Sequence, residues 1–155
     1  MKPEKKIKAI ISMIGLDGHT TGGEVVSRLL RDSGIEVVYL GVNQTPEMIA
    51  KAAVQEDVDA IGISSHASNY SQIIELVELL KKKDMSHVPV FCGGTIPKQQ
   101  VARLKASGVA EVFLPRSTSQ AIVTRILDLV RTRPADPGGA TDRDIGANSL
   151  PTSFA

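Results

Sequence analysis

Hydrophobic and polar residues follow two different spacings along the first 132 residues of the chain. Short apolar runs rich in β-branched residues predict buried strands, and apolar residues three or four apart predict amphipathic helices. Within residues 22–32, for example, Val25, Val26 and Leu29 fall on one helix face, and Gly34 supplies a stop signal. The pattern predicts strands at 7–13, 36–41, 60–64, 88–92 and 111–114, and helices at 22–32, 45–56, 69–83, 97–107 and 119–132.

Five successive strand–helix units predict an α/β fold whose parallel sheet is covered by helices on both faces. The nearly continuous apolar runs of the strands agree with burial on both sides. For five units, we expect the doubly wound, flavodoxin-like (Rossmann-like) strand order 2-1-3-4-5. In that order the chain reverses direction between the first and third strands, and ligands bind outside the carboxyl ends of the strands at such a point.

The composition changes after Thr132. Residues 133–155 are rich in proline and glycine and contain few apolar residues, so we expect a disordered C-terminal tail. Residues 1–132 are long enough to form one domain with its own core. The sequence therefore predicts one ligand-binding domain, 1–132, followed by the tail.

The overall charge and cysteine content narrow the function classes. With 18 basic and 17 acidic side chains, the net charge of +1 gives no electrostatic basis for binding nucleic acid or a membrane surface. The sequence contains no 18-residue apolar run and no signal-peptide pattern. The single cysteine excludes an internal disulfide and fits a reducing compartment, so we expect a cytoplasmic protein.

The segment Asp17-Gly18-His19-Thr20-Thr21-Gly22 follows the first predicted strand. An aspartate two residues before a histidine can accept the Nδ1 hydrogen of the imidazole and leave Nε2 free to bind a metal. Taken alone, the segment fits a polar turn with a helix-capping threonine better than a metal site. However, Ser64 ends the third strand and Gly93-Gly94 follows the fourth, so the predicted topology brings all three motifs to one edge of the sheet.

Asp-x-His-x-x-Gly, then a serine and then Gly-Gly at about these spacings, resembles the cobalamin-binding domain of adenosylcobalamin-dependent mutases and of cobalamin-dependent methionine synthase. The resemblance covers about residues 6–131. Three segments are most similar in sequence to acyl-CoA mutases of the methylmalonyl-CoA type. They are Gly15-Leu16-Asp17-Gly18-His19, Gln44-Thr45-Pro46 and Cys92-Gly93-Gly94-Thr95-Ile96-Pro97. The cofactor that it implies is adenosylcobalamin.

The resemblance also implies roles for single residues. His19 corresponds to the histidine that ligates cobalt in place of the cofactor's own dimethylbenzimidazole, and Asp17 orients it. Ser64 corresponds to the serine that hydrogen-bonds the displaced base, while Gly93 and Gly94 leave room for the nucleotide tail. The implied cofactor-binding set is Asp17, Gly18, His19, Thr20, Thr21, Gly22, Ser64, His66, Gly93, Gly94 and Ser117, with His19 as the metal ligand. For Thr20 and Thr21, helix capping is the alternative role.

Three positions depart from the family pattern. His66 stands where the family usually has leucine, and we expect it to line the cofactor cavity or a partner interface without ligating cobalt. Met13 stands where many acyl-CoA mutases have a lysine, so the relay behind Asp17 lacks its first member. Ser117, preceded by Arg116, replaces a common Gly-Thr pair.

The function implied is that of the small, cobalamin-binding subunit of an adenosylcobalamin-dependent acyl-CoA mutase, which catalyses radical carbon-skeleton isomerisation. The chain is too short to contain a substrate barrel of roughly 250 residues as well. We therefore expect no catalytic residue in this chain, no activity of the chain alone, and a hetero-oligomer with a large, acyl-CoA-binding TIM-barrel subunit. The acyl group stays open among methylmalonyl, isobutyryl, 2-hydroxyisobutyryl and longer branched groups.

Two alternatives use the same fold. One is a corrinoid carrier or methyltransferase module, although the helical cap domain expected before such a module is not seen in the sequence. The other is a non-enzymatic regulator, either a cobalamin sensor or a phosphorylation receiver. A receiver needs an aspartate at the end of the third strand, where this chain has Ser64.

Overall fold

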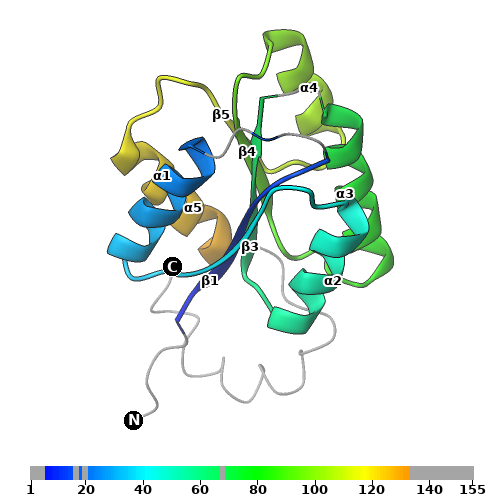
Figure 1. Cartoon of the computed structure of the whole chain (residues 1–155), viewed down its shortest axis with the longest axis horizontal. Helices are drawn as coiled ribbons and strands as arrows, with labels where there is room; N and C mark the ends of the chain where they lie inside the picture. Colours follow the sequence, from blue (N-terminus) through cyan, green and yellow to red (C-terminus); the bar gives the residue numbers. More distant parts are fainter. Residues whose placement is uncertain (1–5, 16–17, 19–20, 67–68, 133–155) are drawn as a thin grey trace.

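A single parallel sheet with helices on both faces forms the protein in the computed structural model, which describes residues 6–15, 18, 21–66 and 69–132 (Figure 1). The strand order β2-β1-β3-β4-β5 confirms the predicted topology. The strands are β1 (Lys8–Met13), β2 (Glu36–Gly41), β3 (Ala60–Ser65), β4 (Val90–Gly94) and β5 (Glu111–Phe113). The helices are α1 (Thr21–Asp32), α2 (Pro46–Glu56), α3 (Tyr70–Lys82), α4 (Lys98–Ala106) and α5 (Ser119–Thr132).

Local sequence signals explain where α2 begins and ends. The Thr45 hydroxyl accepts a hydrogen bond from the Met48 amide at 3.1 Å, and Pro46 occupies the first helical position. Proline is favoured there because its fixed φ suits the helix and its missing N–H has no intrahelical partner to lose. The helix ends at Asp57, which adopts a left-handed conformation with φ of 51°.

The two faces of the sheet are covered by different helices. In Figure 1, α1 and α5 lie on one side of the strands, and α2, α3 and α4 lie on the other. Because side chains alternate along a strand, each strand contributes to both cores. On β3, for example, Ile61 and Ile63 belong to the core beneath α2–α4, whereas Ala60 belongs to the core beneath α1 and α5.

The largest difference from the predicted boundaries lies at the carboxyl edge. The sequence predicts a strand at 88–92 with two glycines after it, but β4 includes Gly93 and Gly94, which pair with Ser64 and Ser65 of β3. Glycine is a weak strand former, so the sequence gives little sign that the ladder continues through both. None of the described helices has the length and apolar character needed to cross a bilayer. The predicted tail, 133–155, lies outside the described residues.

Candidate functional site

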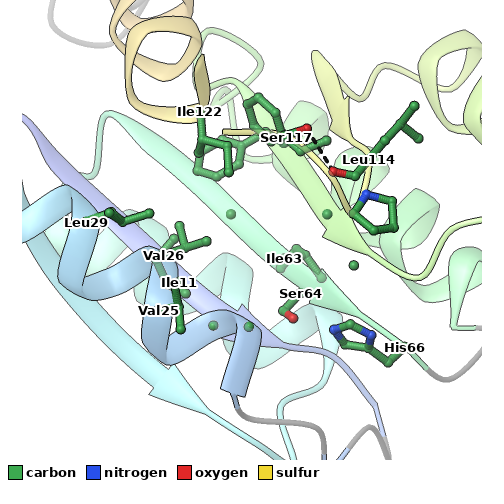
Figure 2. Close-up of a pocket in the computed structure, with 18 of the residues that line it drawn as sticks. Ile11, Val25, Val26, Leu29, Ile63, Ser64, His66, Leu114, Ser117 and Ile122 are labelled. Atoms are coloured by element: carbon green, nitrogen blue, oxygen red, sulfur yellow. Dashed lines mark hydrogen bonds between the residues drawn. The ribbon is translucent and has the colours of Figure 1, made fainter. Parts of the chain in front are cut away.

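A cavity of about 360 Å³ lies between the sheet, α1 and α5, at the carboxyl ends of the central strands (Figure 2). Its volume falls at the lower end of the range of roughly 300–1,000 Å³ that is usual for small-molecule sites. Its lining is mostly apolar, and the polar side chains come from serine, threonine and histidine. The lining residues are Ile11, Gly22, Gly23, Val25, Val26, Leu29, Gly62, Ile63, Ser64, His66, Phe91, Gly93, Gly94, Thr95, Phe113, Leu114, Pro115, Ser117, Ser119 and Ile122.

Small residues at alternating positions of the central strands create this space. Gly62 and Ser64 of β3, and Gly93 of β4, line the cavity. Their neighbours in the sequence, such as Ile61 and Cys92, are fully buried in the core of the opposite face. The period of two in a strand therefore sends Ile61 and Cys92 to one face and leaves space beside Gly62, Ser64 and Gly93 on the other.

Two aromatic rings lie on the cavity side of the sheet. A Cβ atom at Gly62 would lie 2.4 Å from the Phe91 ring, so that ring can rest on the sheet only because residue 62 is glycine. The Phe91 and Phe113 rings pack edge to face, with centroids 5.9 Å apart and planes at 75°. Both phenylalanines line the cavity, which gives it an apolar, aromatic wall.

Gly22, Ser64 and His66 come together at one end of the cavity, where Figure 2 shows the serine and the imidazole near each other. A Cβ atom at Gly22 would lie 3.3 Å from Ser64 Oγ and 3.5 Å from His66 Nε2. His66 Nδ1 lies 3.0 Å from Thr95 Oγ1. The start of α1 therefore meets the ends of β3 and β4 at a small polar cluster.

The two glycines at the end of β4 serve different purposes. Gly94 has a φ of +121°, and a Cβ there would lie 2.4 Å from the Ser65 carbonyl oxygen, so only glycine lets the two strand ends approach this closely. At Gly93, a Cβ would make ordinary contact with Phe113, at 3.4 Å. A side chain at residue 93 is therefore sterically possible, and its absence leaves the cavity open.

The structure gathers six of the predicted site residues around this cavity, namely Gly22, Ser64, His66, Gly93, Gly94 and Ser117. Ser117 lies across from His66, and its hydroxyl donates to the Leu114 carbonyl at 2.8 Å (Figure 2). Gly18 is exposed, and a Cβ there would meet no atom of the other described residues within 4 Å. Asp17, His19 and Thr20 lie outside the described residues, as does the side chain of Thr21.

The metal-ligand prediction for His19 therefore stays a prediction. Among the described residues, no group of three or more histidine, cysteine, aspartate or glutamate side chains is arranged to hold a metal ion. A cobalt ion held by a single protein imidazole does not need such a group. Met13, which stands where many acyl-CoA mutases have a lysine, is fully buried, and its sulfur would lie 3.2 Å from a Cβ at Gly23, in the first turn of α1.

Cys92 is a core residue rather than part of the site. Its side chain is fully buried on the α2–α4 face, and burial, aided by the charge of Glu111, raises the pKa of the thiol to about 12. The thiol therefore stays protonated at neutral pH, and an uncharged thiol is a poor nucleophile.

Most of the cavity wall carries no sequence motif. Phe91, Phe113 and Ile122 line it although no motif marks them, and Val25 and Leu114 stand at the cavity with exposed fractions of 53% and 49%. The available signal was the run of small residues at alternating positions of β3, which predicts a hollow on one face. Without knowing which helices cover that face, the walls could not be named.

Known proteins match both the sequence and the fold. The family model of the B12 binding domain matches residues 7–123. The 2-hydroxyisobutanoyl-CoA mutase small subunit of Aquincola tertiaricarbonis is 37% identical over 130 residues, which cover 83% of this chain and 96% of that protein. The pivalyl-CoA mutase small subunit of Xanthobacter autotrophicus is 39% identical over 119 residues, covering 77% of this chain and 80% of the relative.

Longer relatives match through one part of their length. The methylmalonyl-CoA mutase of Escherichia coli is 36% identical over 127 residues, which are 81% of this chain but 18% of that enzyme. Among solved structures, a cobalamin-binding protein from Desulfitobacterium hafniense has a TM-score of 0.71 at 19% identity, covering 81% of this chain and 60% of that one. The receiver domain of NarL from Mycobacterium tuberculosis has a TM-score of 0.65, also at 19% identity, covering 84% and 100%. At such identities these structures show the fold alone.

Proposed function

Since the chain belongs to the B12-binding domain family, we propose that it is the cobalamin-binding small subunit of an adenosylcobalamin-dependent acyl-CoA mutase. The observation that carries the proposal is the meeting of Gly22, Ser64, His66 and the Gly93-Gly94 pair around one apolar cavity at the carboxyl edge of the sheet. These residues come from separate motifs, and the fold places them where ligands of doubly wound sheets bind.

The cavity has the character needed for the lower base of the cofactor and its nucleotide tail. A flat aromatic base suits a space walled by Phe91, Phe113 and Ile122, and the described residues that line it include no aspartate, glutamate, lysine or arginine. Ser64 supplies a hydroxyl at the end where the base would meet the strand ends.

His19 is the proposed cobalt ligand, and Asp17 the group that fixes its tautomer. When bound, adenosylcobalamin supplies the radical chemistry of the isomerisation, and this chain holds it in place. The proposal needs no catalytic residue from this chain.

Substrate binding belongs to a second polypeptide in this proposal. The similar methylmalonyl-CoA mutase of Escherichia coli is a much longer protein, in which the matching part is 18% of the length. We assign the remaining work to a large, acyl-CoA-binding TIM-barrel subunit that forms a hetero-oligomer with this chain. Two relatives are named for 2-hydroxyisobutanoyl-CoA and pivalyl-CoA, which favours a branched acyl-CoA as the substrate class.

The test compares the purified full chain alone with the chain mixed with the large subunit that co-purifies with it. The chain alone should bind adenosylcobalamin and isomerise no acyl-CoA, and the mixture should isomerise a branched acyl-CoA. Cobalamin affinity should rise in the mixture, because binding of the partner to the loaded form stabilises it. Methyl transfer from methylcobalamin in place of isomerisation would instead establish the corrinoid-carrier alternative. Acyl-CoA turnover by the chain alone would contradict the proposal that a second subunit binds the substrate.

A further inference from the structure

A continuous series of hydrogen bonds joins the carboxyl ends of β1, β3 and β4. The Asn69 amide nitrogen donates to the Ile14 carbonyl at 2.7 Å, and its amide oxygen accepts from the Ser65 hydroxyl. The Ser65 carbonyl in turn accepts from the Thr95 amide at 3.0 Å. We call Ile14, Ser65, Asn69 and Thr95 the strand-end clasp.

The position of Asn69 makes its side-chain bonds informative. Asn69 is the residue that precedes the first turn of α3, where an asparagine side chain normally accepts a hydrogen bond from its own helix. Here the side chain makes no such cap bond and reaches instead to Ser65 and to Ile14, 55 residues earlier. The Asn69 side-chain amide therefore links the strand ends by hydrogen bonds and does not cap the helix that follows it.

The clasp is buried and adjoins the cavity wall. Ser65 is fully buried, and Asn69 is 8% exposed. Ser65 lies between Ser64 and His66, which both line the cavity, and Thr95 Oγ1 lies 3.0 Å from His66 Nδ1. A shift of Ser65 would therefore move two cavity residues at once.

We propose that Asn69 is a positioning residue of the cobalamin site, which sets the end of β1 against the wall formed by Ser64 and His66. This inference rests on the proposed function. Ile14 directly precedes the segment that carries Asp17 and His19, so its carbonyl is a fixed point close to where that segment leaves the sheet. A second bond, from the Gly15 amide to the Gln44 carbonyl at 2.7 Å, ties the same end of β1 to its other neighbour. Loss of Asn69 should therefore loosen this edge without unfolding the chain.

The opposite edge of the sheet offers a matched control. Asp59 is 4% exposed, and its carboxylate accepts a hydrogen bond from the Lys8 amide at 2.9 Å, which ties the first residue of β1 to the residue before β3. Like Asn69, it is a buried side chain that bonds the β1 backbone, but it does so at the amino edge, away from the cavity. Asp59→Ala should therefore cost stability without changing the cofactor site.

The experiment compares the full chain with Asn69→Ala, Ser65→Ala and Asp59→Ala. Urea unfolding gives the stability of each variant, and absorbance titration with adenosylcobalamin gives its affinity under conditions where every variant is folded. Asn69→Ala should weaken binding by about tenfold or more, Ser65→Ala by a smaller factor in the same direction, and Asp59→Ala by about twofold or less. In Asn69→Ala, the fraction of bound cob(II)alamin that shows coupling to a protein imidazole should also fall.

The outcomes separate this inference from the proposed function. If the unchanged chain does not bind adenosylcobalamin, the proposed function fails and the inference fails with it. If the unchanged chain binds and Asn69→Ala loses no more affinity than Asp59→Ala, only the role of Asn69 is refuted. Should Asn69→Ala not fold, Ser65→Ala decides, because removing one hydroxyl breaks the same series of bonds, and unchanged affinity in that variant refutes the clasp.

Discussion

The two faces of the sheet are built from the same strands but differ in how completely they are filled. Beneath α2, α3 and α4, the described residues form one core of 21 buried residues, whereas beneath α1 and α5 they form a core of eight, beside which the cavity opens. The difference begins in β3, where Ile61 belongs to the larger core, whereas Gly62 and Ser64 line the cavity. One face supplies the packing that stabilises the fold, and the other supplies room for a ligand.

The largest expected contrast between the faces is in stability. Leu76 of α3 is fully buried, so Leu76→Ala should lower the free energy of unfolding by about 2–5 kcal/mol. Ile122 of α5 is partly exposed and borders the cavity, so Ile122→Ala should cost about 1 kcal/mol or less, because fewer packing contacts are lost. Urea unfolding of the ligand-free chain measures both. Equal losses would show that the two faces are equally well packed.

The next largest expected effect is on cobalamin affinity, and two adjacent residues of β4 test it. Gly93→Val places a branched side chain in the cavity at a position where the backbone tolerates one, so the fold should persist while cobalamin affinity falls by about tenfold or more. Cys92→Val changes the adjacent side chain, which points into the closed core, and serves as the control. Titration with adenosylcobalamin gives both affinities. Equal losses of affinity in the two variants would show that the space beside Gly93 does not receive the cofactor.

The smallest expected effect on stability concerns an ion-pair network that links helices on the two faces of the sheet. Glu111 of β5 pairs with Lys105 of α4 at 3.1 Å and with Arg125 of α5 at 2.9 Å. Burial alone would raise the pKa of Glu111, but hydrogen bonds from Arg125 and Lys105 hold it below the usual 4.5. A carboxyl group with a lowered pKa stabilises the folded state above its unfolded pKa, and this contribution is lost as the pH falls through the folded pKa.

Glu111→Gln should therefore destabilise the chain at neutral pH by under about 1 kcal/mol, because the pair is partly exposed. The difference from the unchanged chain should shrink as the pH falls below about 4.5. Unfolding curves measured between neutral and acidic pH follow this difference. A gap that widens in acid would mean that the carboxyl group is not stabilised as an anion.

These contrasts also show what the sequence alone could predict. The five strand–helix units and the capped start at Thr45 followed from periodicity and local signals, because each depends on neighbouring residues. The strand order and the two-sided covering followed from the number of such units and from the family resemblance. The cavity residues Ser64, Gly93 and Gly94 were found through motifs. The sequence did not predict that Phe91 lines the cavity. Its ring packs over Gly62 of the neighbouring strand, and a contact between two strands has no local sequence signal.

Asn69 shows even more clearly that contacts between distant residues have no local sequence signal. Its sequence context predicts a helix start, and the structure does place it just before α3. Its side chain nevertheless bonds Ile14, and no local rule distinguishes that choice from ordinary capping. The cofactor motif Asp17-Gly18-His19 is the reverse case, since the sequence predicts a function for residues 17 and 19, which lie outside the described structure.

The most direct test of the account is the paramagnetic resonance spectrum of cob(II)alamin bound to the full chain, recorded with natural and with ¹⁵N-labelled histidine. We predict that the nitrogen coupling changes on labelling, is lost in His19→Ala and is retained in His66→Leu. The reason is that Asp17, two residues before His19 in the sequence, is proposed to orient that imidazole, whereas His66 lies beside Thr95. A spectrum that does not change on labelling would contradict ligation by any protein histidine. Coupling that persists in His19→Ala and disappears in His66→Leu would assign the cobalt to the other imidazole.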